Sequence, residues 1–205
     1  MGSVQMPYII RFFSPKFWIC EIATTEKIIY LTFDDGPIPE TTPEILSILK
    51  DHQVPATFFC VGDNVRKYPE VFEMVKNEGH SIGNHGFNHL NGWKTPPGAY
   101  IENVHRCNDY FKTDLFRPPY GRFSFSQYVL LHREFRFILW SVLTWDFKNT
   151  TTPEKCLSNA ICNSRAGSIV VFHDSLKTIE NVRYALPRFL DHFLDKGYRF
   201  EGIRV

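Results

Sequence analysis

The sequence predicts an α/β fold in which parallel strands alternate with helices. Short apolar runs rich in β-formers alternate about seven times with longer amphipathic runs, an order that favours a parallel sheet covered by helices. Unusual polar residues come directly after the strand candidates, as in parallel sheets whose reactive groups sit at the strand ends. Both an open doubly wound sheet and a closed barrel satisfy these observations.

The predicted strands are apolar runs in which β-branched and aromatic residues predominate. In chain order they span 28–33, 56–60, 81–84, 115–117, 137–142, 168–172 and 198–201. The intervening amphipathic runs predict helices over 42–51, 69–78, 100–111, 126–134, 153–163 and 181–196. Pro43 and Pro153 fit a first helical turn, and Gly79 and Gly197 stand where a helix C-cap belongs.

Composition narrows the class of protein. The chain has 205 residues, 43% of them hydrophobic, which is ordinary for one globular domain. A net charge of +1 gives no sign of a nucleic-acid-binding surface, and no apolar run approaches the ~20 residues of a transmembrane helix. The five cysteines are widely spaced, lack a C-x-x-C pair and read as reduced thiols. With no recognisable signal peptide, these features predict a cytoplasmic protein.

Two adjacent carboxylates end the first predicted strand. Asp34 and Asp35 follow a strongly apolar run within the segment T-F-D-D-G-P at 32–37. Like charges side by side raise at least one pKa unless a cation or donor compensates. Because side chains alternate faces along a strand, one carboxylate can hold a metal while the other acts as a base. The alternative is a simple turn, since Asp-Gly-Pro is good turn chemistry.

His85 and His89 follow the third predicted strand with the spacing i, i+4. On a helical turn, that spacing places both imidazoles on one face, which suits two metal ligands. Adding Asp35 gives a His₂-carboxylate set that leaves coordination positions open, as catalytic zinc sites do, and that also suits iron(II). The alternative is a pair of surface histidines.

The segment R-P-P-Y-G at 117–121 predicts a rigid loop after the fourth strand. Its prolines have no N–H, so Tyr120 is the first residue able to offer a fixed backbone donor, as an oxyanion requires. Arg117 can pair with a carboxylate and keep it ionised. The alternative is a strand-exit turn with a surface arginine.

His173 leaves the sixth predicted strand, and Asp146 follows the fifth. A histidine serves as a general acid when its pKa lies near the working pH. A carboxylate such as Asp146 would orient the ring and favour its charged form. The alternative is a hydrogen-bonded histidine at the rim of the sheet.

With these motifs assembled, the chain resembles a polysaccharide deacetylase of the NodB-homology type, carbohydrate esterase family 4. Segment 32–37 matches the first family motif in full, segment 85–89 matches H-[ST]-x-x-H except for Gly86, and segment 117–121 matches the third motif. The resemblance runs from about Lys27 to Gly202. It predicts a domain over 27–205, with residues 1–26 as an N-terminal extension packing on it.

The resemblance implies a distorted (β/α) barrel of about seven parallel strands. It implies that Asp35, His85 and His89 bind a divalent metal, with Zn²⁺ favoured over Co²⁺, Ni²⁺ or Fe²⁺. The remaining implied roles are the general base for Asp34, its tether for Arg117, the oxyanion donor for the Tyr120 N–H, and the general acid for His173.

The fourth and fifth motifs depart from the family pattern. The family's W-S-V-D-x-x-D-W is W-S-V-L-T-W-D-F here, with Leu143 for the first acid, Asp146 retained and Phe147 for the last tryptophan. L-x-H becomes Val171-Phe172-His173. Loss of the acid at 143 removes a possible hydrogen-bond partner, and Phe147 and Val171 reshape the wall expected to hold the acetyl methyl. These changes therefore bear on substrate identity.

The predicted activity is metal-dependent hydrolysis of the acetamide of N-acetylated sugars, such as chitin- or peptidoglycan-like oligosaccharides, to amine and acetate. An alternative keeps the same site and changes the substrate to a linear or cyclic non-sugar amide. A third interpretation is a non-catalytic sugar- or metal-binding module, although such a module needs no paired base and acid.

Overall fold

The computed structural model describes Val4 and residues 17–204. The strands are β1 (Ile28–Asp34), β2 (Thr57–Cys60), β3 (Ser81–Asn84), β4 (Leu115–Phe116), β5 (Arg136–Phe137), β6 (Val142–Leu143), β7 (Ile169–His173) and β8 (Arg199–Phe200). The helices are α2 (Thr42–Asp51), α3 (Gly62–Lys67), α4 (Pro69–Asn77), α5 (Pro97–Cys107), α6 (Phe125–Leu131), α7 (Pro153–Asn163) and α8 (Ile179–Leu194). Two 3₁₀ turns are η2 (Gly92–Lys94) and η3 (Pro119–Gly121).

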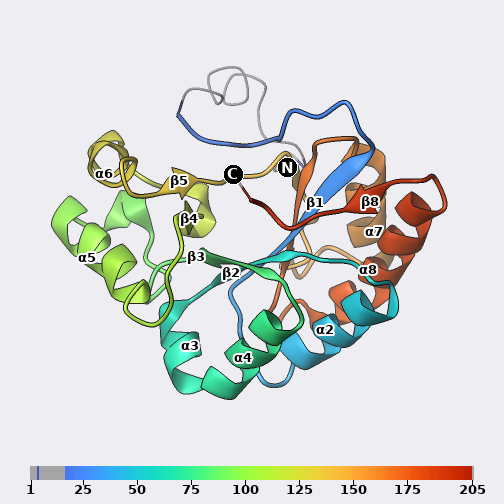
Figure 1. The fold of residues 1–205 in the computed structure, drawn as a ribbon, viewed down its shortest axis with the longest axis horizontal. Helices are drawn as coiled ribbons and strands as arrows, with labels where there is room; N and C mark the ends of the chain where they lie inside the picture. Colours follow the sequence, from blue (N-terminus) through green and yellow to red (C-terminus); the bar gives the residue numbers. More distant parts are fainter. Residues whose placement is uncertain (1–3, 5–16, 205) are drawn as a thin grey trace.

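The strands form one curled, parallel sheet. Its order is β5-β4-β3-β2-β1-β7-β6, and β8 pairs with the beginning of β1. Helices α2, α8 and α7 lie along one part of the sheet, and α5 and α6 lie beside its β4–β5 end (Figure 1). This confirms the predicted α/β fold with about seven parallel strands, curled into a distorted half-barrel.

The predicted strand 137–142 is wrong as a single element, because it forms two short strands, β5 and β6. Ile138 N–H donates to Phe116 O beside β4, whereas Ser141 N–H donates to Ile169 O of β7. The run therefore crosses the opening between β5 and β6, the two ends of the curled sheet. Along the run, the backbone hydrogen-bond partners change from residues of β4 to residues of β7. Helix α3 was not predicted: it has six residues, begins at Gly62 and has no side-chain cap.

Residues 17–22 lie across the same opening. Ile19 N–H donates to Phe137 O and Ile19 O accepts from Leu139 N–H, while Ile22 N–H donates to Gly167 O near β7. The part of the predicted N-terminal extension that the structure describes thus contacts both sides of the opening. Residues 1–3 and 5–16 of that extension lie outside the described residues, and the domain boundary at residue 26 stays a prediction.

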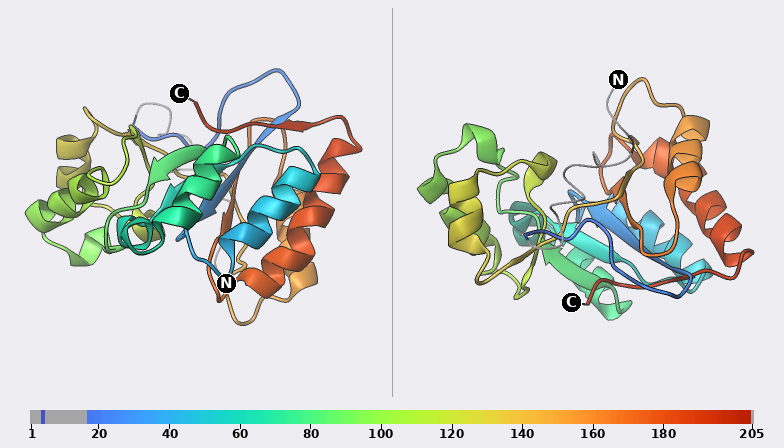
Figure 2. Two further views of the ribbon diagram at one scale, coloured as in Figure 1. Left: turned by 60° about the horizontal axis from the view of Figure 1, so that its bottom comes forward. Right: turned by 90° about the horizontal axis from the view of Figure 1, so that it is seen from above.

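Strand β1 divides its side chains between two environments. Ile29, Leu31 and Phe33 belong to the large core cluster that includes residues of α2 and α8, which run side by side in Figure 2. The alternating residues face the inside of the curl, where an apolar cluster fills the far end and Thr32 and Asp34 lie closer to the carboxyl edge. Two polar residues thereby enter the interior of the sheet.

The register brings the carboxyl ends of neighbouring strands together. In the register of the sheet, Asp34 is paired with Phe59 of β2 and with His173 of β7. Cys60 is level with Asn84 of β3, which in turn pairs with Phe116 of β4. Loops leaving these strands therefore begin at one edge of the sheet, and five loops bring the predicted site residues there.

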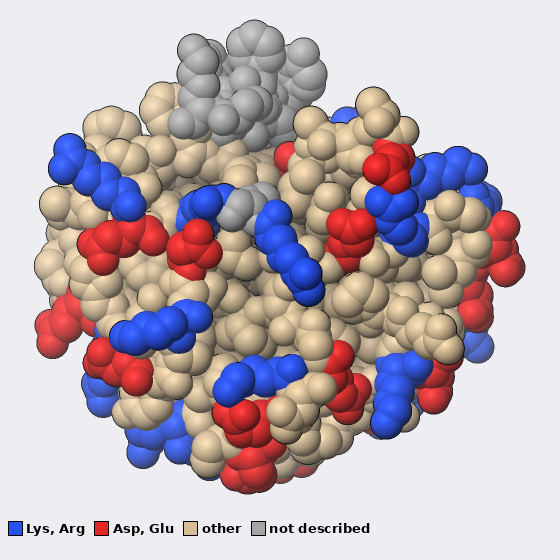
Figure 3. Space-filling model, in the orientation of Figure 1, with Lys and Arg blue, Asp and Glu red and all other residues tan. Residues whose placement is uncertain are grey.

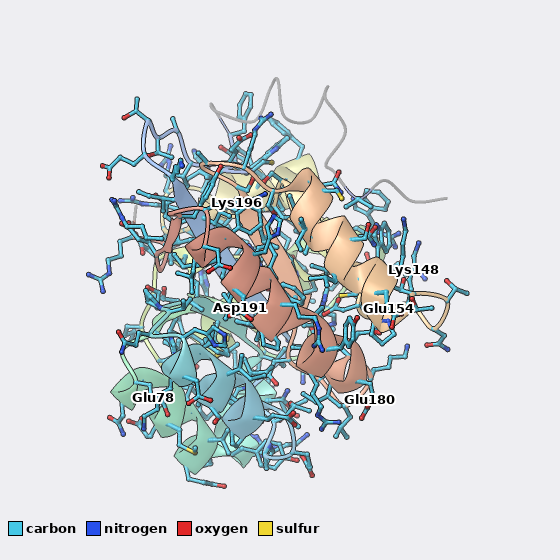
Figure 4. All side chains as sticks on the ribbon, turned by 90° about the vertical axis from the view of Figure 1, so that its right-hand side faces the viewer. Glu78, Lys148, Glu154, Glu180, Asp191 and Lys196 are labelled. Carbon is cyan, nitrogen blue, oxygen red and sulfur yellow. The ribbon has the colours of Figure 1, made fainter. Side chains whose placement is uncertain are left out.

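The outer surface carries charges of both signs. Lysine and arginine are intermixed with aspartate and glutamate on the face shown in Figure 3. Figure 4 shows Glu180 and Asp191 along α8, and both are exposed while the opposite side of the helix enters the core. Within the described part of the chain, no helix combines the length and apolar character of a membrane span.

Candidate active site

Asp34 is held at the end of β1 by a buried arginine. Its Oδ1 accepts from Arg117 Nη1 at 2.7 Å, and its Oδ2 lies 4.0 Å from His85 Nε2. Only 3% of Asp34 is exposed. One carboxylate oxygen is thus tethered, and the other faces the histidines of the neighbouring loop.

Arg117 is fully buried, so the alternative of a surface arginine is wrong. Besides Asp34, its guanidinium donates to Thr32 Oγ1 at 2.7 Å and to the carbonyls of Ile138 and Leu139 at 3.1 and 2.9 Å. Its face lies 4.0 Å from the ring centre of Phe59. Burial lowers the pKa of Arg117, and the carboxylate of Asp34 acts against this shift.

Asp35, His85 and His89 converge on one point. Their ligand atoms all lie within 4.8 Å of one another. Asp35 Oδ1 is 3.2 Å from His89 Nε2 and 3.6 Å from His85 Nε2. The two imidazole centres are 4.9 Å apart. The predicted ligand set is therefore assembled in space, from loops that follow β1 and β3.

The electronic state of these groups fits a cation. His85 Nδ1 lies 2.7 Å from Arg117 O, and only a protonated Nδ1 can donate there, which leaves the Nε2 lone pair facing Asp35. Burial lowers the pKa of His85 to about 4, so the ring is neutral at pH 7. Asp35 Oδ1 is buried and has no hydrogen-bond partner among the described residues.

Burial alone would raise the pKa of the Asp35 carboxyl, but its contact with His89 and the nearby His173 and His85 hold it below its usual range. A carboxylate oxygen and two imidazole nitrogens that converge on one point fit a divalent ion. Zinc suits the donor set, and its identity stays a prediction.

Residues 85–91 form no helix, so His85 and His89 do not share a helical face. The chain instead turns through positive φ at Gly86 and His89. Asn103 of α5 holds this turn: its Oδ1 accepts from the N–H of Phe87 and of Asn88. At φ +74°, glycine suits position 86 better than the usual serine or threonine of the motif.

Tyr120 lies in the 3₁₀ turn η3 with φ +61°. Gly121 N–H and Arg122 N–H donate to the carbonyls of Pro118 and Pro119, whereas the Tyr120 N–H has no acceptor among the described residues. The phenol ring stands 4.6 Å from the His89 ring, centre to centre. Both a free backbone donor and an aromatic face therefore lie beside the candidate metal ligands.

His173 is half-buried at the end of β7 and pairs with the buried Asp146 of the loop after β6. Asp146 Oδ1 lies 2.8 Å from His173 Nδ1, and Asp146 Oδ2 accepts from the His173 N–H at 2.6 Å. Burial favours the neutral ring, but the charge of Asp146 and its hydrogen bond outweigh burial and raise the pKa of His173 to about 9. Both carboxylate oxygens are occupied, so His173 is fixed with Nε2 as its remaining nitrogen.

Strained backbone gathers at this site. Among the described non-glycine residues with positive φ, Asp35, His89, Tyr120 and Trp145 all belong to the loops around it, and only Gln53 lies elsewhere. Such conformations persist where the surroundings enforce them, and they concentrate at functional sites. No sequence motif predicted this strain.

The three departures in the fourth and fifth family motifs lie on β6, on β7 and in the loop after β6. Val171 is level with Thr32 across the sheet and is fully buried on the same inner face. The ring of Phe147 meets the His173 ring edge-on at 4.8 Å. Leu143 is buried at the end of β6. The ring of Phe147 therefore forms an apolar wall beside the histidine.

Asp174 follows His173 at the end of the same strand, and the sequence predicted no role for it. Its buried carboxylate accepts from the hydroxyls of Thr41 and Thr42, and its N–H donates to Asp34 O at 2.7 Å. Gly36 passes so close that a Cβ there would meet Asp174 Oδ2 at 2.2 Å. These contacts fasten the loop after β1, which carries Asp35, to the loop after β7.

A cleft of about 330 Å³ opens beside the three candidate ligands. It is lined by Asp35, Ile38, Val61, Asp63, Asn64, Asn88 and His89. Asn64 Nδ2 donates to Asp35 O at 2.7 Å. Amide and carboxylate groups in this wall can exchange hydrogen bonds with a hydroxyl-rich ligand.

Comparison with known proteins shows the family of this chain. The family model "Polysaccharide deacetylase" matches residues 21–132. A peptidoglycan-N-acetylglucosamine deacetylase of Bacillus cereus is 34% identical over 178 residues, covering 83% of this chain and 64% of that protein. A chitooligosaccharide deacetylase of Azorhizobium caulinodans is 34% identical over 163 residues, covering 75% of this chain and 76% of that protein. The chain thus spans slightly less than two thirds of the first of these relatives.

The fold has close counterparts among solved structures. One is a peptidoglycan N-acetylglucosamine deacetylase in complex with 4-naphthalen-1-yl-N-oxidanyl-benzamide. It superposes with a TM-score of 0.86 at 31% sequence identity, covering 91% of each chain.

Proposed function

The chain belongs to the polysaccharide deacetylase family, and on that premise we propose that it is a metal-dependent deacetylase of N-acetylated oligosaccharides. The observation that carries this proposal is the convergence of three groups at one sheet edge. These are the Asp35–His85–His89 triad, the Arg117-tethered Asp34 and the Asp146-paired His173. A binding module would need only the first.

In this proposal Asp35, His85 and His89 hold a divalent ion. Such an ion polarises a carbonyl as a Lewis acid and lowers the pKa of water, to about 7 in some zinc enzymes. The other chemistry comes from the chain's own residues, which surround the same point from the loops after β1, β4, β6 and β7.

Asp34 accepts the proton of the attacking water through Oδ2, since Arg117 occupies Oδ1. The Tyr120 N–H donates to the oxygen of the acetyl group as negative charge develops on it. His173 then gives its proton to the departing amine nitrogen, and Asp146 stabilises the imidazolium until that transfer. Acetate and a free amine result.

An acetate-release assay tests the proposal. Zinc-loaded protein is incubated with N-acetylglucosamine oligomers, with peptidoglycan fragments and with small linear and cyclic amides. Acetate release from the sugars, lost on chelation and restored by zinc, is the expected result. Turnover of non-sugar amides alone would favour the alternative substrate class, and turnover of none would contradict the proposal.

The pH dependence of turnover tests the role of His173. A general acid works in its protonated form, so activity is expected to fall as pH rises through the pKa of His173. In Asp146→Asn the charge that raises this pKa is gone and burial lowers it, so the basic limb of kcat/KM moves to lower pH. Kinetics from pH 5 to 10 measure the shift, and an unmoved basic limb would contradict the assignment.

A further inference from the structure

Asp35 has a backbone conformation that residues with a side chain rarely adopt. Its φ is +82°, in the left-handed region that favours glycine. Such a conformation is strained, and it persists only where the surroundings enforce it. The contacts of the peptide groups on either side of Asp35 therefore decide how this candidate metal ligand is held in position.

The segment after β2 fixes two carbonyls of the turn at Asp35. Asp35 O accepts from Nδ2 of Asn64, in α3, at 2.7 Å. Gly36 O accepts from the Val61 N–H at 2.9 Å. These bonds hold the turn on the side that faces α3.

Asp174, directly after β7, holds the turn on its other side. Its N–H donates to Asp34 O at 2.7 Å. Its carboxylate lies against Gly36, where a Cβ would come within 2.2 Å of Asp174 Oδ2 and 2.8 Å of Asp174 Cγ. Asp174 therefore contacts the residue before Asp35 through its backbone and the residue after Asp35 through its side chain.

The carboxylate of Asp174 is itself fixed by two hydroxyls. Oδ1 accepts from the hydroxyl of Thr41 and Oδ2 from that of Thr42, and all three side chains are fully buried. Thr42 Oγ1 also accepts from the Ile38 N–H at 2.7 Å, so the proton of this hydroxyl is directed to Asp174. Asp174, Thr41 and Thr42 are here called the Asp174 clamp.

The stability of helix α2 does not account for the clamp. Thr41 stands at the N-cap of α2, where a threonine hydroxyl ordinarily accepts an N–H of the first turn. It makes no such bond here and donates to Asp174 instead. The hydroxyl thus connects the loop after β1 to the end of β7, and residues that depart from a local structural preference are expected at functional sites.

We propose that the Asp174 clamp holds Asp35 in its strained conformation before a metal binds, so that Oδ1 already faces the two histidines. The proposal rests on the metal site of the deacetylase function proposed above. It makes Asp174 a positioning residue that acts through Gly36 and the Asp34 carbonyl. Contacts that orient a ligand typically change metal affinity by about 10- to 100-fold, because an unfixed ligand must be ordered when the metal binds.

The zinc affinity of the apo protein, measured by competition with a chelator, tests the clamp. Asp174→Asn keeps the size of the side chain but loses one of its two acceptor oxygens, so the Kd for zinc is expected to rise about tenfold. Thr41→Val removes one donor at similar volume and should also raise the Kd, whereas Thr41→Ser keeps the hydroxyl and should bind zinc like the wild type. An unchanged Kd in both Asp174→Asn and Thr41→Val would overturn the proposal.

Urea unfolding with and without zinc separates positioning from a merely structural role. If the clamp only supported the fold, each variant would lose the same free energy of unfolding in the apo and the zinc-loaded protein. Under the proposal the loss is larger in the zinc-loaded protein, because zinc stabilises the native state by an amount that its Kd sets. Equal losses in the two forms would contradict positioning.

Thr57 provides a matched control. Its hydroxyl is also fully buried, and it accepts from the Ile203 N–H at 2.8 Å. It lies at the beginning of β2, at the opposite end of that strand from the candidate site. Thr57→Val should destabilise both forms equally and leave the Kd for zinc unchanged. A loss of zinc affinity comparable to that of Thr41→Val would contradict a specific role for the clamp.

These affinities do not depend on turnover, so they separate this inference from the proposed catalysis. A weaker zinc Kd in Asp174→Asn and Thr41→Val supports the clamp even if no substrate releases acetate. Wild-type zinc affinity in both variants of an active enzyme overturns the clamp and leaves the proposed function standing. Wild-type protein that binds no zinc would overturn both.

Discussion

Replacing Asp34 by asparagine is expected to abolish turnover while leaving the metal bound. Asparagine keeps the shape and can still accept the hydrogen bond from Arg117, but it cannot take a proton from water. General-base catalysis contributes about 10²- to 10⁴-fold, so kcat should fall by that order. Acetate release and metal content are measured on the same preparations.

His85→Ala is the companion variant. Its Nε2 is one of the three converging ligand atoms, so this variant should lose both activity and zinc affinity. The two variants therefore separate the base from the metal site. Wild-type activity in zinc-loaded Asp34→Asn would refute the base assignment, and unchanged zinc affinity in His85→Ala would refute the ligand assignment.

Replacing Arg117 by methionine is expected to destabilise the protein by about 3–5 kcal/mol, the range for breaking a buried ion pair. The change leaves the Asp34 carboxylate buried without its cation, and it removes the donors to the carbonyls of Ile138 and Leu139. Activity should fall as well, because Asp34 loses its tether. Urea unfolding gives the change in the free energy of unfolding.

A double variant identifies the cause of that loss. If the unpaired charge dominates, adding Asp34→Asn to Arg117→Met should restore part of the stability, since the buried charge is gone. The effects of the two substitutions would then be clearly non-additive. Arg117→Met costing less than about 1 kcal/mol would contradict the buried ion pair that the structure shows.

The strand ends were predictable because polar residues there have few structural explanations. Asp34 and Asp35 end a strongly apolar run, and parallel strands bring their carboxyl ends to one edge. His173 could be placed for the same reason, and its register with Asp34 confirms that the two strand ends are neighbours. The predicted fold class required only the repeated order of strand and helix.

The loop conformations were not predictable from local sequence. The spacing of His85 and His89 would suit one face of a helical turn, but tertiary hydrogen bonds from Asn103 impose a non-helical turn there. The Asp174 carboxylate accepts hydrogen bonds from the hydroxyls of Thr41 and Thr42, which lie more than 130 positions earlier in the chain. Neither contact leaves a periodic pattern, because each joins loops from separate parts of the chain.

The run 137–142 shows the same limitation within an element. Its apolar residues fit one strand, yet their backbone partners change from β4 to β7 across the opening of the sheet. Sheet curvature decides that change, and curvature arises from how all the strands pack.

The most direct test of the central claim is a crystal structure of the protein grown with zinc. It should show one zinc ion, identified by anomalous scattering, bound by Asp35 Oδ1 and the Nε2 atoms of His85 and His89 at about 2.0–2.2 Å. Asp34 should lie beside it with Arg117 still bound to Oδ1. Zinc bound elsewhere, or these three side chains turned apart with no ion between them, would contradict the proposed catalytic site.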